Sequence, residues 1–129
     1  MQRGFLVLIS ILILAGIGVA VAVALLFLGI DATRTAGVSE KAAHARALAS
    51  TCAEIALRVI KDTPGFSGYG PEQLLGQGQC GYQIINTGGE NRSVYATGTV
   101  GSVIRRSKVI VSVITPEITI DSWQEVVDF

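Results

Sequence analysis

The chain of 129 residues is half hydrophobic and carries ten basic and ten acidic side chains, so its formal net charge is zero. This balance argues against a polyanion such as nucleic acid as the main partner. The apolar residues are concentrated before Asp31, and the rest of the chain has the composition and length of one small globular domain.

The first predicted element is an apolar helix over residues 5–30, in which nothing is more polar than Ser10. At about 1.5 Å of rise per residue it is longer than the roughly 30 Å hydrocarbon core of a bilayer, so it can span a membrane. A cleaved secretory signal has a shorter apolar core of about 7–15 residues and a small-x-small cleavage site in a more polar flank. Here the Ala-x-Ala patterns lie inside the apolar run, which favours a retained anchor over a discarded signal.

The flanks and the small residues of this run bear on its orientation and packing. Arg3 precedes the run and favours a cytoplasmic N-terminus, although Arg34 and Lys41 beyond the run weaken that prediction. Small residues recur every four positions, which lets helices approach closely in lipid: Gly16, Ala20 and Ala24, and the pair Gly18 and Ala22. The alternative is that alanine and glycine are merely tolerated in a membrane helix.

Residues 31–62 continue the helix with an amphipathic pattern. Apolar side chains recur at spacings of three and four, the period of one helix face, at Ala45, Leu48, Cys52, Ile55 and Val59. The opposite side is polar and carries Glu40, His44, Thr51, Glu54, Arg58 and Lys61. No proline interrupts residues 5–62, so one long helix is expected, with Gly37 as its weak point and Pro64 just beyond its end.

Residues 63–129 are predicted to form a loop and then a small antiparallel sheet. The loop covers residues 63–79, with at most a short turn near residues 71–75. Strands are expected at "CGYQIIN", "SVYATGTV" and "SKVIVSVIT", and Gly88 and Gly89 make a hairpin between the first two. After Pro116, "EITIDSWQEV" is a fourth strand that turns at Asp121 and Ser122. The apolar helix face over residues 45–60 would cover this sheet, which gives an α+β fold.

Cys52 and Cys80 are the only cysteines, and neither lies in a spacing typical of a zinc site. In an oxidising compartment such a pair usually forms a disulfide, which would stabilise the fold by about 3 to 4 kcal/mol in the loop-entropy model. Two buried free thiols are the alternative. A structural bridge between the two is the prediction, and it would indicate export.

The sequence predicts no catalytic residues, no metal site and no cofactor. Residues 76–81, "GQGQCG", have the spacing of a dinucleotide-binding loop but lack a preceding strand and a following helix. His44 is the only histidine and lies on the polar helix face, which is typical of a solvated side chain. The stretch "GFSGYG" lacks the second spacer residue of a nucleophile elbow and is interpreted as a loop.

Two polar features of the predicted sheet are open to a functional interpretation. Asn91, Arg92 and Ser93 form a glycosylation sequon, for which turn chemistry is the favoured explanation. Arg105, Arg106 and Lys108 form a basic cluster at the start of the third strand, which together with Arg92 could bind DNA or an acidic partner. The favoured interpretation of this cluster is a solvated hairpin end.

The order of segments along the chain carries a family resemblance. A leader of residues 1–4 ends in Gly4, Phe5 opens the apolar helix, and an amphipathic continuation leads to a C-terminal antiparallel sheet. This plan resembles the type IV pilin and pseudopilin family. "AHARALASTCAEIALRVI" is similar to the alanine-rich stretch of minor pilins, and "SWQEV" to an ending found in some bacterial pilin-like proteins. The resemblance implies that a prepilin peptidase cuts between Gly4 and Phe5 and that the new terminus is methylated.

One position departs from the family pattern. Most major pilins carry a glutamate at the fifth residue after the cut, where it pairs with the terminal amine of a neighbouring subunit, and here that residue is Ile9. No acid occurs before Asp31, so an amino terminus buried in an apolar bundle would lack its charge partner. Since some minor pilins and tip pseudopilins also lack the glutamate, the resemblance implies a minor or tip-like subunit.

The resulting prediction is a non-enzymatic filament subunit whose assembly helix begins at Phe5 and includes the small residues named above. The resemblance implies other pilin subunits, a prepilin peptidase, a pilus assembly platform and the membrane as partners. It places the chain in the bacterial cytoplasmic membrane with a cytoplasmic N-terminus, and after assembly in an extracellular or periplasmic filament. The alternative is a single-pass anchored extracytoplasmic binding module that does not polymerise. A small secreted enzyme is disfavoured.

Overall fold

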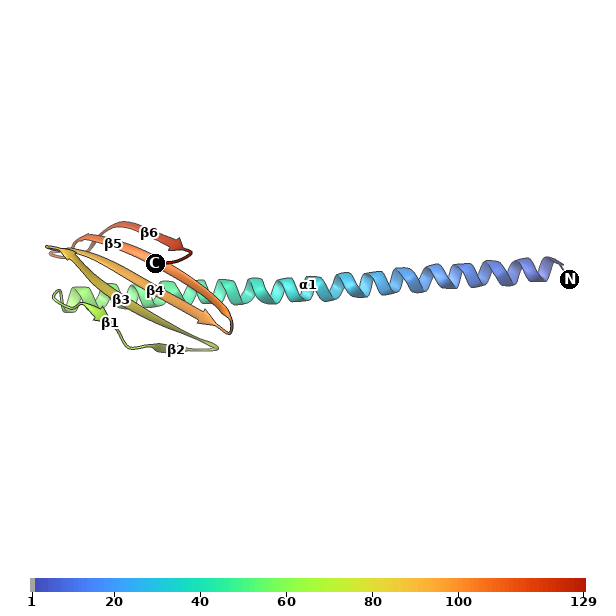
Figure 1. Ribbon diagram of the computed structural model, residues 1–129, viewed down its shortest axis with the longest axis horizontal. Coiled ribbons are helices and arrows are strands. Elements are labelled where there is room, and N and C mark those ends of the chain that lie inside the picture. Colours follow the sequence, from blue (N-terminus) through green and yellow to red (C-terminus); the bar gives the residue numbers. More distant parts are fainter. Residues whose placement is uncertain (1) are drawn as a thin grey trace. The chain divides into compact units, whose positions relative to one another are not determined.

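A computed structural model describes residues 2–129, which form one helix and a six-stranded sheet (Figure 1). The predicted α+β class is confirmed. The elements in chain order are α1 (Gln2–Asp62), β1 (Gly68–Tyr69), β2 (Gln73–Leu75), β3 (Gly78–Gly88), β4 (Asn91–Val100), β5 (Val103–Val113) and β6 (Thr119–Val126).

The chain divides into two compact units between Gly37 and Val38. The first contains α1 as far as Gly37, and the second contains the remainder of α1 and the whole sheet. Helical structure continues through Gly37, where an added Cβ would meet no atom within 4 Å. The predicted weak point is therefore helical, and the boundary between the units falls at the same place. As predicted, α1 ends before Pro64.

The sheet of the second unit is antiparallel throughout, with the strand order β1-β3-β4-β5-β6 and with β2 also paired to β3. β1 and β2 lie along the same edge of β3, since β4 takes the other edge. The expectation of a loop over residues 63–79 is thus wrong for residues 68–69 and 73–75. Strands this short offer too few positions for an alternating pattern, and pairing with β3 decides their conformation.

Of the two turns predicted within the sheet, the hairpin is present and the other is replaced by a bulge. Gly88 and Gly89 have φ of 119° and 56°, and they make the predicted hairpin between β3 and β4. In β6 the predicted turn at Asp121 and Ser122 is instead a bulge, because Ile110 pairs with Ser122 and Val111 pairs with Ile120. Asp121 is the extra residue, and the strand continues beyond it.

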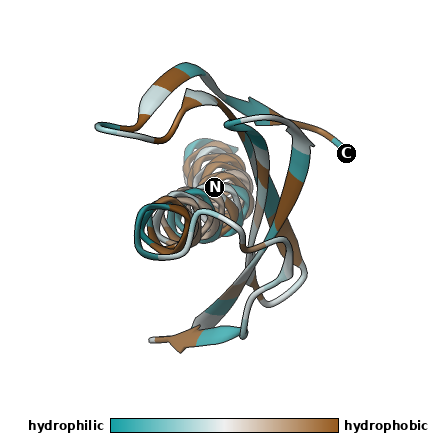
Figure 2. Cartoon of the chain, turned by 90° about the vertical axis from the view of Figure 1, so that its left-hand side faces the viewer, coloured by the Kyte–Doolittle hydropathy of each residue, from teal (hydrophilic) through white to brown (hydrophobic). Residues whose placement is uncertain are grey.

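The hydrophobic core of the second unit lies between α1 and one face of the sheet, which bends around one side of the helix (Figure 2). The helix buries Ala45, Leu48, Ala49, Cys52, Ala53, Ala56 and Ile60. The buried helix face differs in part from the predicted one. Ile55 and Val59 are only partly buried, and alanines occupy the centre of the contact with the sheet. A face of small side chains lets the sheet come close to the helix backbone.

The closest approach of helix and sheet occurs at Gly98 of β4. The predicted alternation of this strand is confirmed, because Val94, Ala96, Gly98 and Val100 are buried and the residues between them are partly exposed. A Cβ at Gly98 would overlap the Ala45 carbonyl oxygen and lie 2.6 Å from the Ala49 nitrogen. Only glycine leaves room for the helix backbone at this point.

A disulfide joins the same two layers, between Cys52 of α1 and Cys80 of β3. The two Cα atoms are 5.9 Å apart, and both side chains are buried in the core. The predicted bridge is present, and the alternative of free thiols is wrong. Because the residues are separated by 28 positions, the chain-entropy model gives a stabilisation of about 3.5 kcal/mol.

The Gly98→Ala variant is expected to be less stable by about 1–3 kcal/mol, because its methyl group would overlap helix backbone that cannot move aside alone. Gly81→Ala is the matched control in the same sheet, since a Cβ there meets only Glu72 Cγ at 3.8 Å. Urea unfolding of the full chain in detergent micelles, followed by fluorescence of the single tryptophan, Trp123, compares the two. Equal midpoints would contradict the close approach.

Candidate functional site

The first candidate site is the apolar part of α1 over residues 5–30. Its large side chains are all exposed, from 40% at Ile9 to 72% at Leu12. Within residues 2–129, α1 is the one helix long and apolar enough to cross a membrane, and none of its most apolar window is buried. Apolar surface of this extent needs lipid or other apolar helices around it, so the segment is compatible with a single-pass membrane anchor.

The hydroxyl groups in and just after the apolar part of α1 donate hydrogen bonds within the helix itself. Ser10 Oγ donates to the Leu6 carbonyl oxygen at 2.9 Å, and Thr33 Oγ1 donates to the Gly29 carbonyl oxygen at 2.8 Å. In hydrocarbon, where water is absent, such a bond to the preceding turn removes most of the cost of a hydroxyl group. The one polar residue of the apolar run is therefore compatible with a membrane.

The small residues of the apolar part of α1 lie in two exposed stripes. At about 100° per residue, Gly16, Ala20 and Ala24 share one side of the helix, and Gly18 and Ala22 lie roughly opposite them. A Cβ at Gly16 or Gly18 would meet no atom within 4 Å, so the fold of the chain itself does not require glycine at either position.

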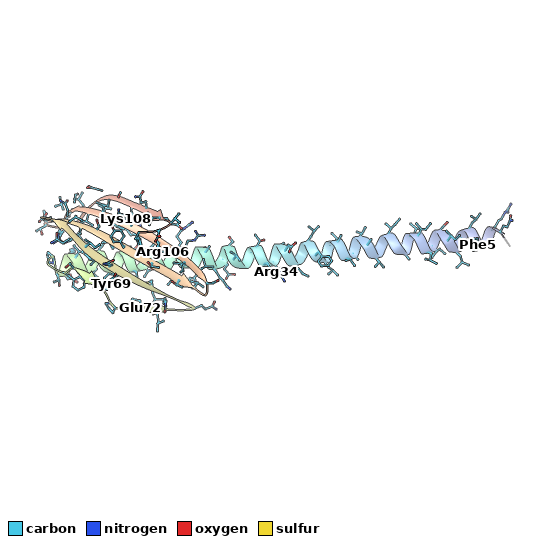
Figure 3. The ribbon with its side chains drawn as sticks, viewed as in Figure 1. Phe5, Arg34, Tyr69, Glu72, Arg106 and Lys108 are labelled. Atoms are coloured by element: carbon cyan, nitrogen blue, oxygen red, sulfur yellow. A yellow bond between two sulfur atoms is a disulfide. The ribbon has the colours of Figure 1, made fainter. Side chains whose placement is uncertain are left out.

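The predicted cleavage bond lies within the first turn of α1, which begins at Gln2 and includes Gly4 and Phe5 (Figure 3). The first four N–H groups of a helix have no acceptor within it, and glycine lowers helix stability by about 1 kcal/mol relative to alanine. Phe5 is exposed. Unwinding this turn therefore costs little. The first turn contains no acid, so Ile9 is not replaced by a nearby carboxylate.

The predicted basic cluster is divided between the two faces of the sheet, because alternate side chains of a strand point to opposite sides. Arg105 lies on the helix side, 3.6 Å from Glu125, which also pairs with Arg46 of α1 at 2.6 Å. Arg106 and Lys108 lie on the outer face (Figure 3), where Arg106 Nη1 donates to the Val127 carbonyl oxygen at 2.8 Å. The three cations do not form one patch.

Arg92 does not belong to a surface patch either, because it is only 5% exposed. Its Nη1 donates to Asn86 Oδ1 and to the carbonyl oxygens of Gly89 and Asn91, and its Nη2 donates to the Pro64 carbonyl oxygen at 2.7 Å. The guanidinium thus joins the β3–β4 hairpin to the loop that follows α1. The two terminal nitrogens of its planar fork suit this structural role, which the sequence did not indicate.

The glycine-rich stretch of residues 76–81 and His44 lie where they form no binding site of the kind considered from the sequence. Residues 76–81 form the turn after β2 and the start of β3, so no helix N-terminus follows that could hold a pyrophosphate. His44 is exposed and faces this turn, since a Cβ at Gly76 would lie 3.8 Å from its Cε1. Residues 2–129 contain no group of three or more His, Cys, Asp or Glu side chains placed to hold a metal ion.

An aromatic cluster on the outer face of the sheet was missed by the sequence analysis. The rings of Tyr95 and Phe129 meet edge to face, with centroids 4.8 Å apart. Arg106 lies over the Phe129 ring and Lys108 over the Tyr95 ring, at 5.8 Å and 5.5 Å from the centroids. The alternation of β4 placed Tyr95 on this face, but no local pattern indicated that residues 127–129 return to it.

The arrangement as a whole fits a pilin-like fold. It combines a long N-terminal helix that is apolar in its first part, an antiparallel sheet on the later part of that helix, and a disulfide between the two layers of the second unit. Comparison of the chain with protein-family models, with curated proteins and with solved structures finds no match.

Removal of the Arg92 guanidinium is expected to lower the stability of the second unit. Arg92→Met would leave the Pro64 carbonyl and the hairpin acceptors without their donor, at a cost of about 1.5–3 kcal/mol. Arg58→Met is the control, since Arg58 is exposed on the helix and its loss should change stability by at most about 0.5 kcal/mol. Urea unfolding measures both, and equal effects would contradict the structural role.

Proposed function

We propose that the chain is a structural subunit of a type IV pilus or a related pseudopilus filament. The observation that carries this proposal is the exposed apolar surface of residues 5–30, on a helix whose later part is covered by a disulfide-linked sheet. An apolar helix surface is stable in lipid or against other apolar helices, but not in water. One surface can therefore serve as the anchor before assembly and as the filament contact afterwards.

The proposed cycle begins in the bacterial cytoplasmic membrane, which the chain spans once with its N-terminus in the cytoplasm. A prepilin peptidase removes residues 1–4 and leaves Phe5 as a methylated terminus, and a pilus assembly platform then brings the helix against those of other pilin subunits. The sheet is exported, which agrees with a disulfide formed in an oxidising compartment. The assembled subunit lies in an extracellular or periplasmic filament and is not an enzyme.

The proposed place of the subunit is minor or tip-like. Ile9 stands where a main building block needs a carboxylate, and the first turn of α1 offers no acid in its place. A buried ammonium group without a counter-charge is expensive, so incorporation next to many identical copies would be unfavourable. A subunit at an end of the filament leaves fewer such termini buried.

The second candidate is a single-pass membrane-anchored binding module that does not polymerise. The same residue, Ile9, favours it, since an anchor in lipid has no need of a charge partner from a neighbouring chain. In this case the N-terminus stays uncut and remains in water at the membrane surface.

Processing at Gly4 distinguishes the two candidates. Intact mass and N-terminal sequencing of the chain from its native membrane should show a start at methylated Phe5, and Gly4→Leu should abolish the cut. Gly29→Leu is the matched control, because a Cβ at either glycine meets no atom within 4 Å and neither variant should disturb the fold. A wild-type chain that keeps Met1 would favour the anchored module, and a start beyond residue 30 would exclude both candidates.

Assembly through the small-residue stripes predicts a second effect. Ala20→Leu should lower the amount of the subunit in sheared filaments by about tenfold while the amount in the membrane stays unchanged, because a larger side chain keeps neighbouring helices apart. Val19→Leu is the control, since this residue is exposed on the same helix and lies off both stripes. Immunoblots of both fractions measure the effect. Equal incorporation of the two variants would argue against close helix packing at this stripe.

A further inference from the structure

The outer face of the sheet, the face away from α1, carries a hollow of about 530 Å³. It lies over β3 and β4 and is bordered by residues 69–72 and by Phe129. Its size falls within the range of about 300–1,000 Å³ that is usual for small-molecule sites. Every residue that lines it belongs to the second unit.

Gly81 is one of the residues that line the hollow, and it places no side chain in it. Gly81 pairs with Thr97 in the middle of the outer face, and a Cβ there would lie 3.8 Å from Glu72 Cγ. The Glu72 side chain therefore extends over the glycine from the edge formed by β1 and β2, where Figure 3 also labels Tyr69. A larger residue at position 81 would fill the floor of the hollow.

The lining combines aromatic rings with neutral hydrogen-bonding groups. Tyr69, Tyr95 and Phe129 supply the rings, and Tyr69 is 79% exposed, so one of its faces is open to a ligand. Gln83 and Thr97 supply an amide and a hydroxyl group, each of which can both donate and accept hydrogen bonds. Such a site suits a ligand with apolar ring faces and a polar, hydroxyl-rich edge.

The charges around the hollow disfavour ionic ligands. Glu72 is the one charged residue of the lining, so an anion inside the hollow would be repelled by its carboxylate. A cationic ligand would in turn meet rings that already hold a cation, because Arg106 lies over Phe129 and Lys108 over Tyr95. A neutral ligand avoids both repulsions.

We infer that this hollow binds a neutral saccharide of one or two rings. The C–H face of a pyranose ring stacks on Tyr69 or Tyr95, while its hydroxyl groups exchange hydrogen bonds with Gln83 and Thr97 and donate to the Glu72 carboxylate. The site lies entirely in the second unit, so the inference goes beyond the proposed assembly function. It holds whether or not the chain polymerises.

The test uses the full chain in a polyoxyethylene detergent, which contains neither sugar nor quaternary ammonium. Saturation-transfer NMR and calorimetric titration compare the neutral saccharides lactose, N-acetyllactosamine, cellobiose and N,N′-diacetylchitobiose with sialyllactose and choline chloride. At least one neutral saccharide is expected to bind with a Kd in the millimolar range or below, and more tightly than either charged probe. Absence of neutral binding, or preference for a charged probe, would overturn the inference.

Three variants locate the binding. Tyr69→Ala should weaken it by about tenfold without changing the thermal midpoint, since this side chain is mostly exposed. Gly81→Val should weaken it by filling the floor, and only Glu72 Cγ lies near the new Cβ. Leu74→Ala, at the same edge, removes an apolar residue that is 81% exposed and does not line the hollow. It should bind like the wild type.

Circular dichroism establishes that each variant is folded before binding is compared. If Gly81→Val does not fold, Tyr69→Ala decides the question, because the loss of an exposed ring cannot unfold the sheet. Wild-type affinity in a folded Tyr69→Ala variant would overturn the inference, and so would an equal loss in Leu74→Ala.

Discussion

Close packing of α1 against β4 is the constraint on which the second unit depends. Gly98 lies against the backbone at Ala45 and Ala49, so no side chain of either element separates the two layers at this point. The short distance between the layers places Cys52 opposite Cys80, where a disulfide fits without displacing the core. A sheet of this size has one face to bury, and the alanine-rich helix face supplies the cover.

One helix serves two environments because its composition changes along its length. Before Asp31 the helix is apolar on every side, and its surface is exposed. Beyond Val38 one face carries alanines and a cysteine against the sheet, while the other carries charges in water. The helical hydrogen bonds are the same in both parts, so the side chains alone decide which part needs lipid or neighbouring helices and which part folds against its own chain.

The two faces of the sheet carry different kinds of side chain. The inner face is committed to the core and, at its edge, to the ion pairs of Glu125 with Arg46 and Arg105. The outer face has no helix on it and carries the aromatic rings, their two cations and the hollow over Gly81. The hollow and the apolar helix surface of residues 5–30 belong to different units of the chain.

The sequence by itself determined the class of the fold, the C-terminal end of the long helix, the β3–β4 hairpin and the disulfide, because helical periodicity, glycine conformation and cysteine pairing act locally or leave few alternatives. The predicted helix face is buried at Ala45, Leu48 and Cys52, but only the tertiary structure decided that alanines occupy its centre and that Ile55 and Val59 are only partly buried. It also decided that the basic side chains near residue 105 lie on opposite faces of the sheet, that Arg92 is buried, and that the Phe129 ring contacts Tyr95. These outcomes depend on contacts between residues distant in sequence, and no local pattern records such contacts.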